Sequence, residues 1–176
     1  MTSSHHSAPP APIAVPAAGV PIRDTPLTVT LPADYTAFCV RNQQAYITYA
    51  RARSQDAQLA RRIVESVLSA LVVIWPTVIA SDRPASVAWR MLSTQVAAAT
   101  RQARRQRKDR VRDTMHSTLP AEQADVLLLR YRLNLSWAQT AELMGLEESE
   151  VAFQLARGIS RLTDADTESG STSVFT

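Results

Sequence analysis

The sequence contains a single cysteine, Cys39, among its 176 residues. One thiol forms neither an intramolecular disulfide nor a cysteine-based zinc site. The sequence therefore excludes a disulfide-stabilised domain and a zinc-stabilised domain with cysteine ligands. A chain without disulfides is typical of a reducing compartment, and the sequence therefore predicts a cytoplasmic protein. Cys39 lies among apolar residues that recur at helical spacing, which favours a buried structural thiol over a reactive one.

Patterns for catalysis and for metal binding are missing as well. Of the three histidines, His5 and His6 stand in a proline-rich leader with no further ligand, and the sequence suggests no partner for His116. No Ser/His/Asp or Cys/His set, glycine-rich phosphate loop or metal-spaced group of ligands is present. We therefore expect no enzyme activity, cofactor, metal or small-molecule substrate, and we interpret His116 as a solvated linker residue.

A secretory signal and a clear membrane span are also missing. The N-terminus has no basic start followed by an apolar run and a cleavage site. The most apolar stretch, residues 67–80, is interrupted by Pro76 and is short for crossing a bilayer. A buried helix end is the favoured interpretation, and no membrane contact is predicted.

Both ends of the chain have the composition of unfolded segments. Residues 1–32 are rich in Pro, Ala, Ser and Thr, with prolines spaced too closely for a helix, which indicates a disordered arm. Residues 164–176 are rich in Ser, Thr and Asp, which indicates a flexible tail. The folded body is therefore expected over residues 33–163.

Apolar residues in the body recur at helical spacing, without the sustained alternation that a half-buried strand needs. The sequence therefore predicts an all-α fold of two small helical domains. Helices are expected over residues 34–53, from about residue 55 to Trp75, just before a proline, and from Pro84 onward. The second of these is apolar nearly all round in its C-terminal half and is expected to be the most buried. Together they predict a bundle of three or four helices over residues 33–105.

A run of basic residues follows the bundle and predicts a linker over residues 106–117. Such a cluster pairs with phosphates and gives salt-dependent affinity that carries no sequence information. The alternative is a solvated helix end followed by a linker, and the residues alone favour neither interpretation. The predicted phosphate contacts are Arg101, Arg104, Arg105 and Arg107.

Residues 118–163 have the pattern of a helix-turn-helix. Pro120 begins a supporting helix, Ser136 is placed to cap a short second helix, and Gly145 permits the left-handed backbone of a tight turn. The outer face of the helix that follows is then free to enter a DNA major groove, although an ordinary helical hairpin remains the alternative. The residues expected to dock this last helix on the other two are Val151, Leu155, Ile159 and Leu162.

The outer face of the last helix carries the candidate DNA contacts. Arginine and glutamine are residue types that read bases, whereas Glu147, Glu148 and Glu150 oppose phosphates and otherwise complement the helix dipole. Phe153 suits three roles: contact with a thymine methyl, insertion into a partner, or packing against a neighbouring segment. The predicted DNA-facing set is Ser149, Glu150, Phe153, Gln154, Arg157 and Arg161.

Residues 119–162, including LSWAQTAELMGL at 135–146, resemble the fourth conserved region of bacterial sigma factors. Upstream, DYTAF at 34–38, the helix ending at Trp75, and WRM at 89–91 before the arginines are similar to the second region of the same family. The order of the two regions and the short linker resemble the extracytoplasmic-function group.

The resemblance implies a promoter-specific transcription initiation factor that binds promoter DNA and core RNA polymerase. Residues 149–161 would face the upstream promoter element and residues 90–105 the downstream element. An anti-sigma protein is implied as a further partner. The N-terminal bundle would grip the coiled coil of the largest polymerase subunit, through a surface that carries Arg61, Arg62, Glu65 and Ser66.

Three alternatives remain open. A divergent sigma-like protein could act as a protein-interaction regulator without promoter recognition, which the acidic start of the last helix and Phe153 support. A stand-alone helix-turn-helix regulator needs only the C-terminal domain, and the N-terminal bundle argues against it. An enzyme is the least favoured, because the catalytic patterns are missing.

Overall fold

The computed structural model describes residues 31–106 and 114–171, and these residues form helices and no strands. The all-α prediction is therefore confirmed. The predicted N-terminal arm lies outside the described residues up to Thr30, whereas Leu31–Thr176 forms one compact unit. Its elements are α1 (Ala33–Ser54), α2 (Ala57–Ile79), α3 (Pro84–Gln106), α4 (Thr114–Thr118), α5 (Ala121–Leu127), the π-helical turn η1 (Leu128–Arg132), α6 (Trp137–Met144) and α7 (Glu148–Ser171).

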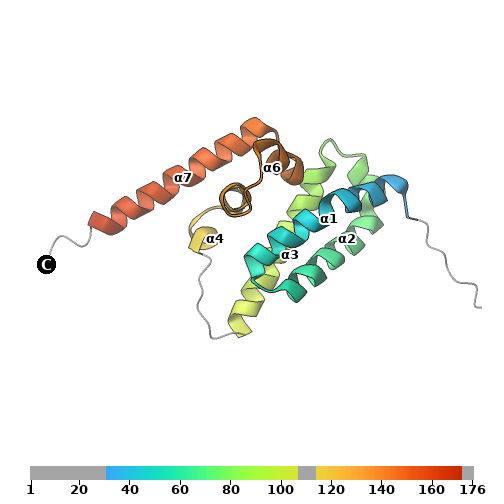
Figure 1. Ribbon diagram of the computed structural model, residues 1–176, viewed down its shortest axis with the longest axis horizontal. Helices are drawn as coiled ribbons and strands as arrows, with labels where there is room; N and C mark the ends of the chain where they lie inside the picture. Colours follow the sequence, from blue (N-terminus) through green and yellow to red (C-terminus); the bar gives the residue numbers. More distant parts are fainter. Residues whose placement is uncertain (1–30, 107–113, 172–176) are drawn as a thin grey trace, which may run out of the picture. The chain divides into compact units, whose positions relative to one another are not determined.

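Helices α1, α2 and α3 pack side by side as the N-terminal bundle (Figure 1). Asp56 separates the first two helices, because its carboxylate accepts hydrogen bonds from the free backbone N–H groups of Gln58 and Leu59, each at 3.0 Å. Aromatic rings fill the core, with the centroids of Tyr49 and Trp89 4.5 Å apart. The bundle is thus built around buried aromatic and aliphatic side chains from all three helices.

Helix α2 continues beyond Pro76 to Ile79, so the predicted end of this helix at Trp75 is wrong. Pro76 removes one backbone hydrogen bond and crowds the preceding turn, but the buried side chain of Val78 holds the extra turn against the core. Ser81 then satisfies the carbonyl of Val78, with its hydroxyl 2.6 Å from that oxygen. Helix α2 therefore ends one residue after Val78, the last buried side chain on its core-facing side.

The C-terminal half of α2 is also less buried than expected, because Val73 is 77% exposed and Ile74 is 42% exposed. This helix has the length and the mean hydropathy, 1.7, of a membrane span. Its opposite face packs in the bundle core, and length and composition alone are weak evidence for a span. The buried side chains of that face are Ala60, Ile63, Val64, Val67, Leu68, Leu71, Trp75 and Val78.

The C-terminal helices follow the predicted order. Ser136 caps α6 by accepting the N–H of Gln139 at 3.1 Å, while the Gln139 side chain accepts the N–H of Ser136 at 2.8 Å. Gly145 ends α6 with φ of 66°, the left-handed conformation that glycine adopts without strain. Arg130 stacks 4.2 Å from the Trp137 ring centroid, which fixes the connection from η1 to α6.

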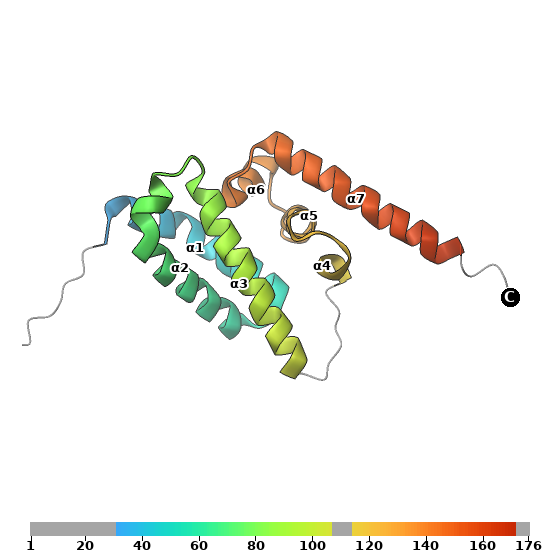
Figure 2. The same ribbon diagram turned by 180° about the vertical axis from the view of Figure 1, so that it is seen from behind.

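Helix α7 differs from the prediction in two ways. It reaches Ser171, past residue 164, where the sequence predicts a flexible tail (Figure 2). Ile159 is 42% exposed, so its predicted docking role is wrong, and Gly158 is buried against Leu127 instead. At 100° per residue, position 158 lies closer than 159 to the face centred on Val151, because seven residues complete almost two turns.

Candidate nucleic-acid interface and the network behind it

The outer face of α7 presents four of the six predicted DNA-facing side chains to solvent. Phe153, Arg157 and Arg161 are exposed, and Ser149 is exposed at the first turn. The Arg157 guanidinium carbon lies 5.4 Å from the centroid of the Phe153 ring, so the aromatic ring supports the charged group from one side. Gln154 is half-buried and donates a hydrogen bond of 3.2 Å to Glu122 of α5. The exposed part of the face is therefore an arginine pair beside an aromatic ring.

The acidic start of α7 makes contacts within the protein. The Glu150 carboxylate accepts the backbone N–H of Glu147 at 2.8 Å and the guanidinium of Arg83, also at 2.8 Å. These two contacts hold the pKa of Glu150 below its ordinary value, the backbone hydrogen bond being the larger cause. Glu150 thus satisfies a free N–H at the helix start and links α7 to the loop before α3.

The described part of the arginine cluster lies at the C-terminal end of α3. Arg101, Arg104 and Arg105 are exposed and follow the i, i+3, i+4 spacing that puts side chains on one face. Arg107 lies outside the described residues. The end of α3 therefore offers a cationic face of the kind that contacts phosphates.

The predicted polymerase-facing residues lie on the outer face of α2. Arg61, Arg62, Glu65 and Ser66 are all exposed. Toward the C-terminus this face continues into the exposed apolar side chains Val73 and Ile74, which the sequence interpretation assigned to the core. The outer face of α2 is thus charged in its first half and apolar in its second.

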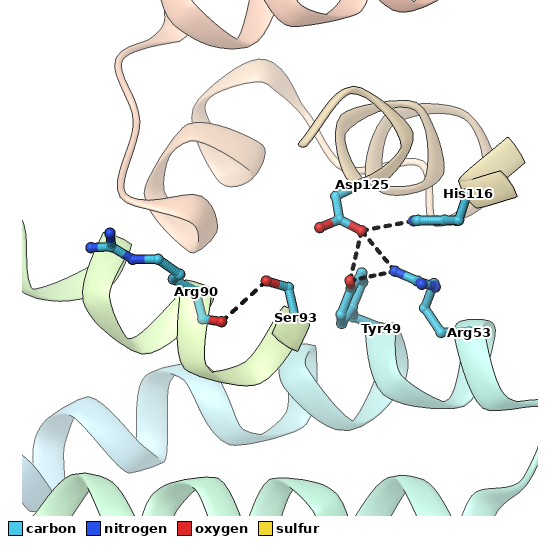
Figure 3. A network of polar contacts seen from close by, with 6 residues as sticks. All are labelled: Tyr49, Arg53, Arg90, Ser93, His116 and Asp125. Carbon is cyan, nitrogen blue, oxygen red and sulfur yellow. Dashed lines mark hydrogen bonds and ion pairs between the residues drawn. The ribbon is translucent and has the colours of Figure 1, made fainter. Parts of the chain in front are cut away.

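A buried polar network, which the sequence did not predict, joins α1 to α4 and α5 (Figure 3). One oxygen of Asp125 accepts the Tyr49 hydroxyl at 2.6 Å and lies 3.1 Å from the Arg53 guanidinium. The same oxygen is 2.8 Å from Nε2 of His116. Arg53 also donates to the Tyr49 hydroxyl at 3.0 Å. We call Tyr49, Arg53, His116 and Asp125 the buried latch.

The buried latch corrects the interpretation of His116. Its side chain is 7% exposed, and it belongs to the short helix α4, inside the segment predicted as linker. Its partner follows nine residues later, while the other members of the latch come from α1. The only sequence signal is the position of Asp125 directly before the apolar run of residues 126–129, which is compatible with a buried carboxylate and does not indicate its partners.

The charged members of the latch are buried. The side chains of Arg53 and Asp125 are 6% and 2% exposed, so the two charges compensate one another away from water. Burial raises the pKa of Tyr49 well above its ordinary value, and the charge of Asp125 raises it further. Tyr49 therefore stays protonated and donates. Removing one partner from a buried ion pair costs about 3–5 kcal/mol, because the other charge is left uncompensated.

Helices α6 and α7, joined by the tight turn at Gly145, define a helix-turn-helix with a free outer face. Residues 113–162 match the family model for sigma-70, region 4. The match covers less than a third of the chain and supports a sigma-70 region 4 in this segment, with a sigma-factor-like DNA-binding role. Sigma region 4 as a family implies interaction with DNA and with RNA polymerase. A search of curated proteins finds no match to the chain.

Proposed function

We propose that this protein is an RNA polymerase sigma factor of the extracytoplasmic-function type, which directs promoter-specific initiation in the cytoplasm. The observation that carries the proposal is the match to sigma-70 region 4 after a three-helix bundle, with the exposed pair Arg157 and Arg161 on α7. Helix order and the arginine-rich end of α3 agree with the order of the second and fourth sigma regions. Neither module needs an active site for this role.

In the proposed complex, α7 reads the upstream promoter element. Arg157 and Arg161 lie one turn apart on the exposed face, and arginine forms bidentate hydrogen bonds with guanine in the major groove. Arg101, Arg104 and Arg105 contribute phosphate contacts near the downstream element, with no base reading of their own. Specificity then depends on α7, and salt sensitivity depends on both helices.

The bundle is proposed to bind core polymerase through the outer face of α2. Arg61, Arg62 and Glu65 supply the charged half of that face, and Val73 with Ile74 supplies an apolar half. Apolar side chains bounded by charged groups are typical of a protein interface. An anti-sigma protein is the further partner that the family resemblance suggests.

A second candidate is a sigma-like regulator that binds proteins and recognises no promoter. Two observations favour it: Glu150 is engaged with Arg83, and Gln154 is engaged with Glu122, so two of the predicted DNA-facing residues have partners inside the protein. In this candidate, Phe153, 56% exposed, inserts into a protein partner.

Run-off transcription with core polymerase separates the two candidates. We expect the protein to yield promoter-dependent transcripts, and Arg157→Ala to reduce them by about tenfold, because one base contact is worth about 1–3 kcal/mol. Arg51→Ala is the matched control, since Arg51 is an exposed arginine on α1. Co-purification with core enzyme without transcripts from any promoter would favour the regulator.

A further inference from the structure

We infer that a cavity beside the buried latch binds a free α-amino acid with an aromatic side chain. The cavity has a volume of about 410 Å³, within the range of small-molecule sites, and its walls come from α3, α5, the end of α6 and the turn that follows α6. No bond is made or broken in such a site, so the amino acid is a ligand and not a substrate. This binding goes beyond the proposed function and does not depend on it.

A buried carboxylate lies in the wall of the cavity. Asp125 is 2% exposed, and the three other members of the buried latch all contact the same one of its oxygens. Its other oxygen has no partner among the residues that the structure describes, and Figure 3 shows it turned away from these contacts, on the side where Ser93 lies. A carboxylate oxygen has two lone pairs, so Asp125 keeps an acceptor for an N–H donor placed in the cavity.

Two charges of opposite sign lie on different walls of the cavity. Glu122 of α5 accepts a hydrogen bond from the neutral amide of Gln154 at 3.2 Å, which leaves its negative charge uncompensated. Arg90 of α3 is exposed and has no ion-pair partner within the described part of the chain. The charge of Asp125 is already compensated by Arg53. The lining therefore presents one free negative and one free positive charge, which favours a zwitterion over a simple cation or anion.

The charged ends of an α-amino acid match these groups. The ammonium group has three N–H donors, which suit Glu122 and the second oxygen of Asp125, three residues apart on α5. The carboxylate suits the guanidinium of Arg90. Ser93 lies between Arg90 and Asp125 in Figure 3 and donates to the Arg90 carbonyl at 3.3 Å, so its oxygen is a further acceptor for the ammonium group.

The rest of the lining suits an aromatic side chain. Trp89 contributes an indole ring that is packed on Tyr49, with the ring centroids 4.5 Å apart. Met144 and Leu146 add apolar surface from α6 and the turn after it. Aromatic rings pair well with one another, and methionine sulfur packs favourably at the edge of a ring. An aromatic amino acid would therefore bury its ring here while its two charges face Glu122 and Arg90.

Isothermal titration calorimetry of the full chain, with L-phenylalanine as the probe, tests this binding. We expect one site with a Kd below about 1 mM. Phenethylamine lacks the carboxylate and 3-phenylpropionate lacks the ammonium group, so each should bind at least about tenfold more weakly, because each loses a charge-assisted hydrogen bond. Glycine should also bind at least about tenfold more weakly, because it buries no ring.

Two substitutions test the charged walls separately. Arg90→Gln and Glu122→Gln should each weaken the binding of L-phenylalanine by about tenfold. Arg51→Gln and Glu148→Gln are the matched controls, because they change exposed residues of the same two types that do not line the cavity. The controls should leave the Kd unchanged. Thermal unfolding of each variant without ligand checks that it is folded.

Three outcomes would overturn the inference. The first is no binding heat and no rise of the Tm with L-phenylalanine at about 10 mM, ten times the expected limit of the Kd. The second is equal affinity for L-phenylalanine and for either analogue that has a single charge. The third is an unchanged Kd in both Arg90→Gln and Glu122→Gln. Each of them leaves the sigma-factor proposal standing, since that proposal is tested by transcripts and not by ligand binding.

Discussion

Two tyrosines on α1 provide a sharp test of the polar contacts inside this protein. Tyr46 and Tyr49 lie one turn apart, and neither has any exposed surface. The Tyr49 hydroxyl donates to Asp125 and accepts from Arg53, whereas the Tyr46 hydroxyl is buried with no hydrogen-bond partner among the residues that the structure describes. A buried polar group without a partner costs about 1–3 kcal/mol. Tyr46→Phe should therefore increase the free energy of unfolding by about 1 kcal/mol.

The same substitution at Tyr49 should have the opposite sign. It leaves Asp125 with one donor fewer inside the protein, and a hydrogen bond to a charged group is worth about 1.5–3 kcal/mol. Urea unfolding of both variants measures the difference, with an unchanged denaturant slope as the sign that the folded and unfolded states are otherwise the same. The expected shift of Tm is about 2–4 °C per kcal/mol. Equal losses of stability in Tyr46→Phe and Tyr49→Phe would refute the hydrogen-bond partners assigned to the two hydroxyls.

Three other features of the structure give further predictions. Burial raises the pKa of the same two tyrosines above the ordinary value of about 10, so their stabilising contribution is complete below that pH. Urea unfolding between about pH 9 and about pH 11 should show stability falling by about 1.4 kcal/mol per pH unit for each tyrosine above about pH 10. Gly145→Ala should lower the Tm clearly, because φ is positive and the added Cβ meets backbone. Gly158→Ala should be nearly neutral, because its added Cβ meets side chains alone, those of Leu127 at 3.0 Å and Gln123 at 3.5 Å, and alanine favours the helix. Replacing Arg101 and Arg105 by glutamine should reduce the salt slope of duplex binding by about 0.9 for each phosphate that the protein no longer neutralises, and an unchanged slope would exclude this face from the DNA-binding surface.

Local signals account for what the sequence predicts well. Asp56, Ser136 and Gly145 are residues whose chemistry acts within a few positions of the chain, and each ends or begins a helix where expected. The helix-turn-helix was predictable for the same reason, since its cap, turn and apolar face lie within one continuous segment. The matched family model covers this segment and none of residues 33–105.

Interactions between distant residues account for what the sequence does not predict. The members of the buried latch are separated by up to 76 residues, so no local pattern brings His116 and Asp125 to Tyr49. Exposure of Val73 has a similar cause, because an apolar run does not show which of its faces finds a neighbour. Helix periodicity predicts the buried face of α7 only approximately. It predicts that Ile159 faces the core, whereas in the structure Gly158 is buried there and Ile159 is exposed.

The acidic start of α7 has to be understood from both its local sequence and a contact with a distant residue. From the sequence alone, three glutamates at the front of a DNA-reading helix are an unfavourable feature, since they repel phosphates. Glu150 is bonded both to a free N–H of its own helix and to Arg83, so its charge is compensated inside the protein. A carboxylate engaged in this way repels an approaching duplex less than a free one. The exposed arginines of this helix, Arg157 and Arg161, lie further along it, so the proposed function places the energetic weight of DNA binding on the middle of α7 and away from its first turn.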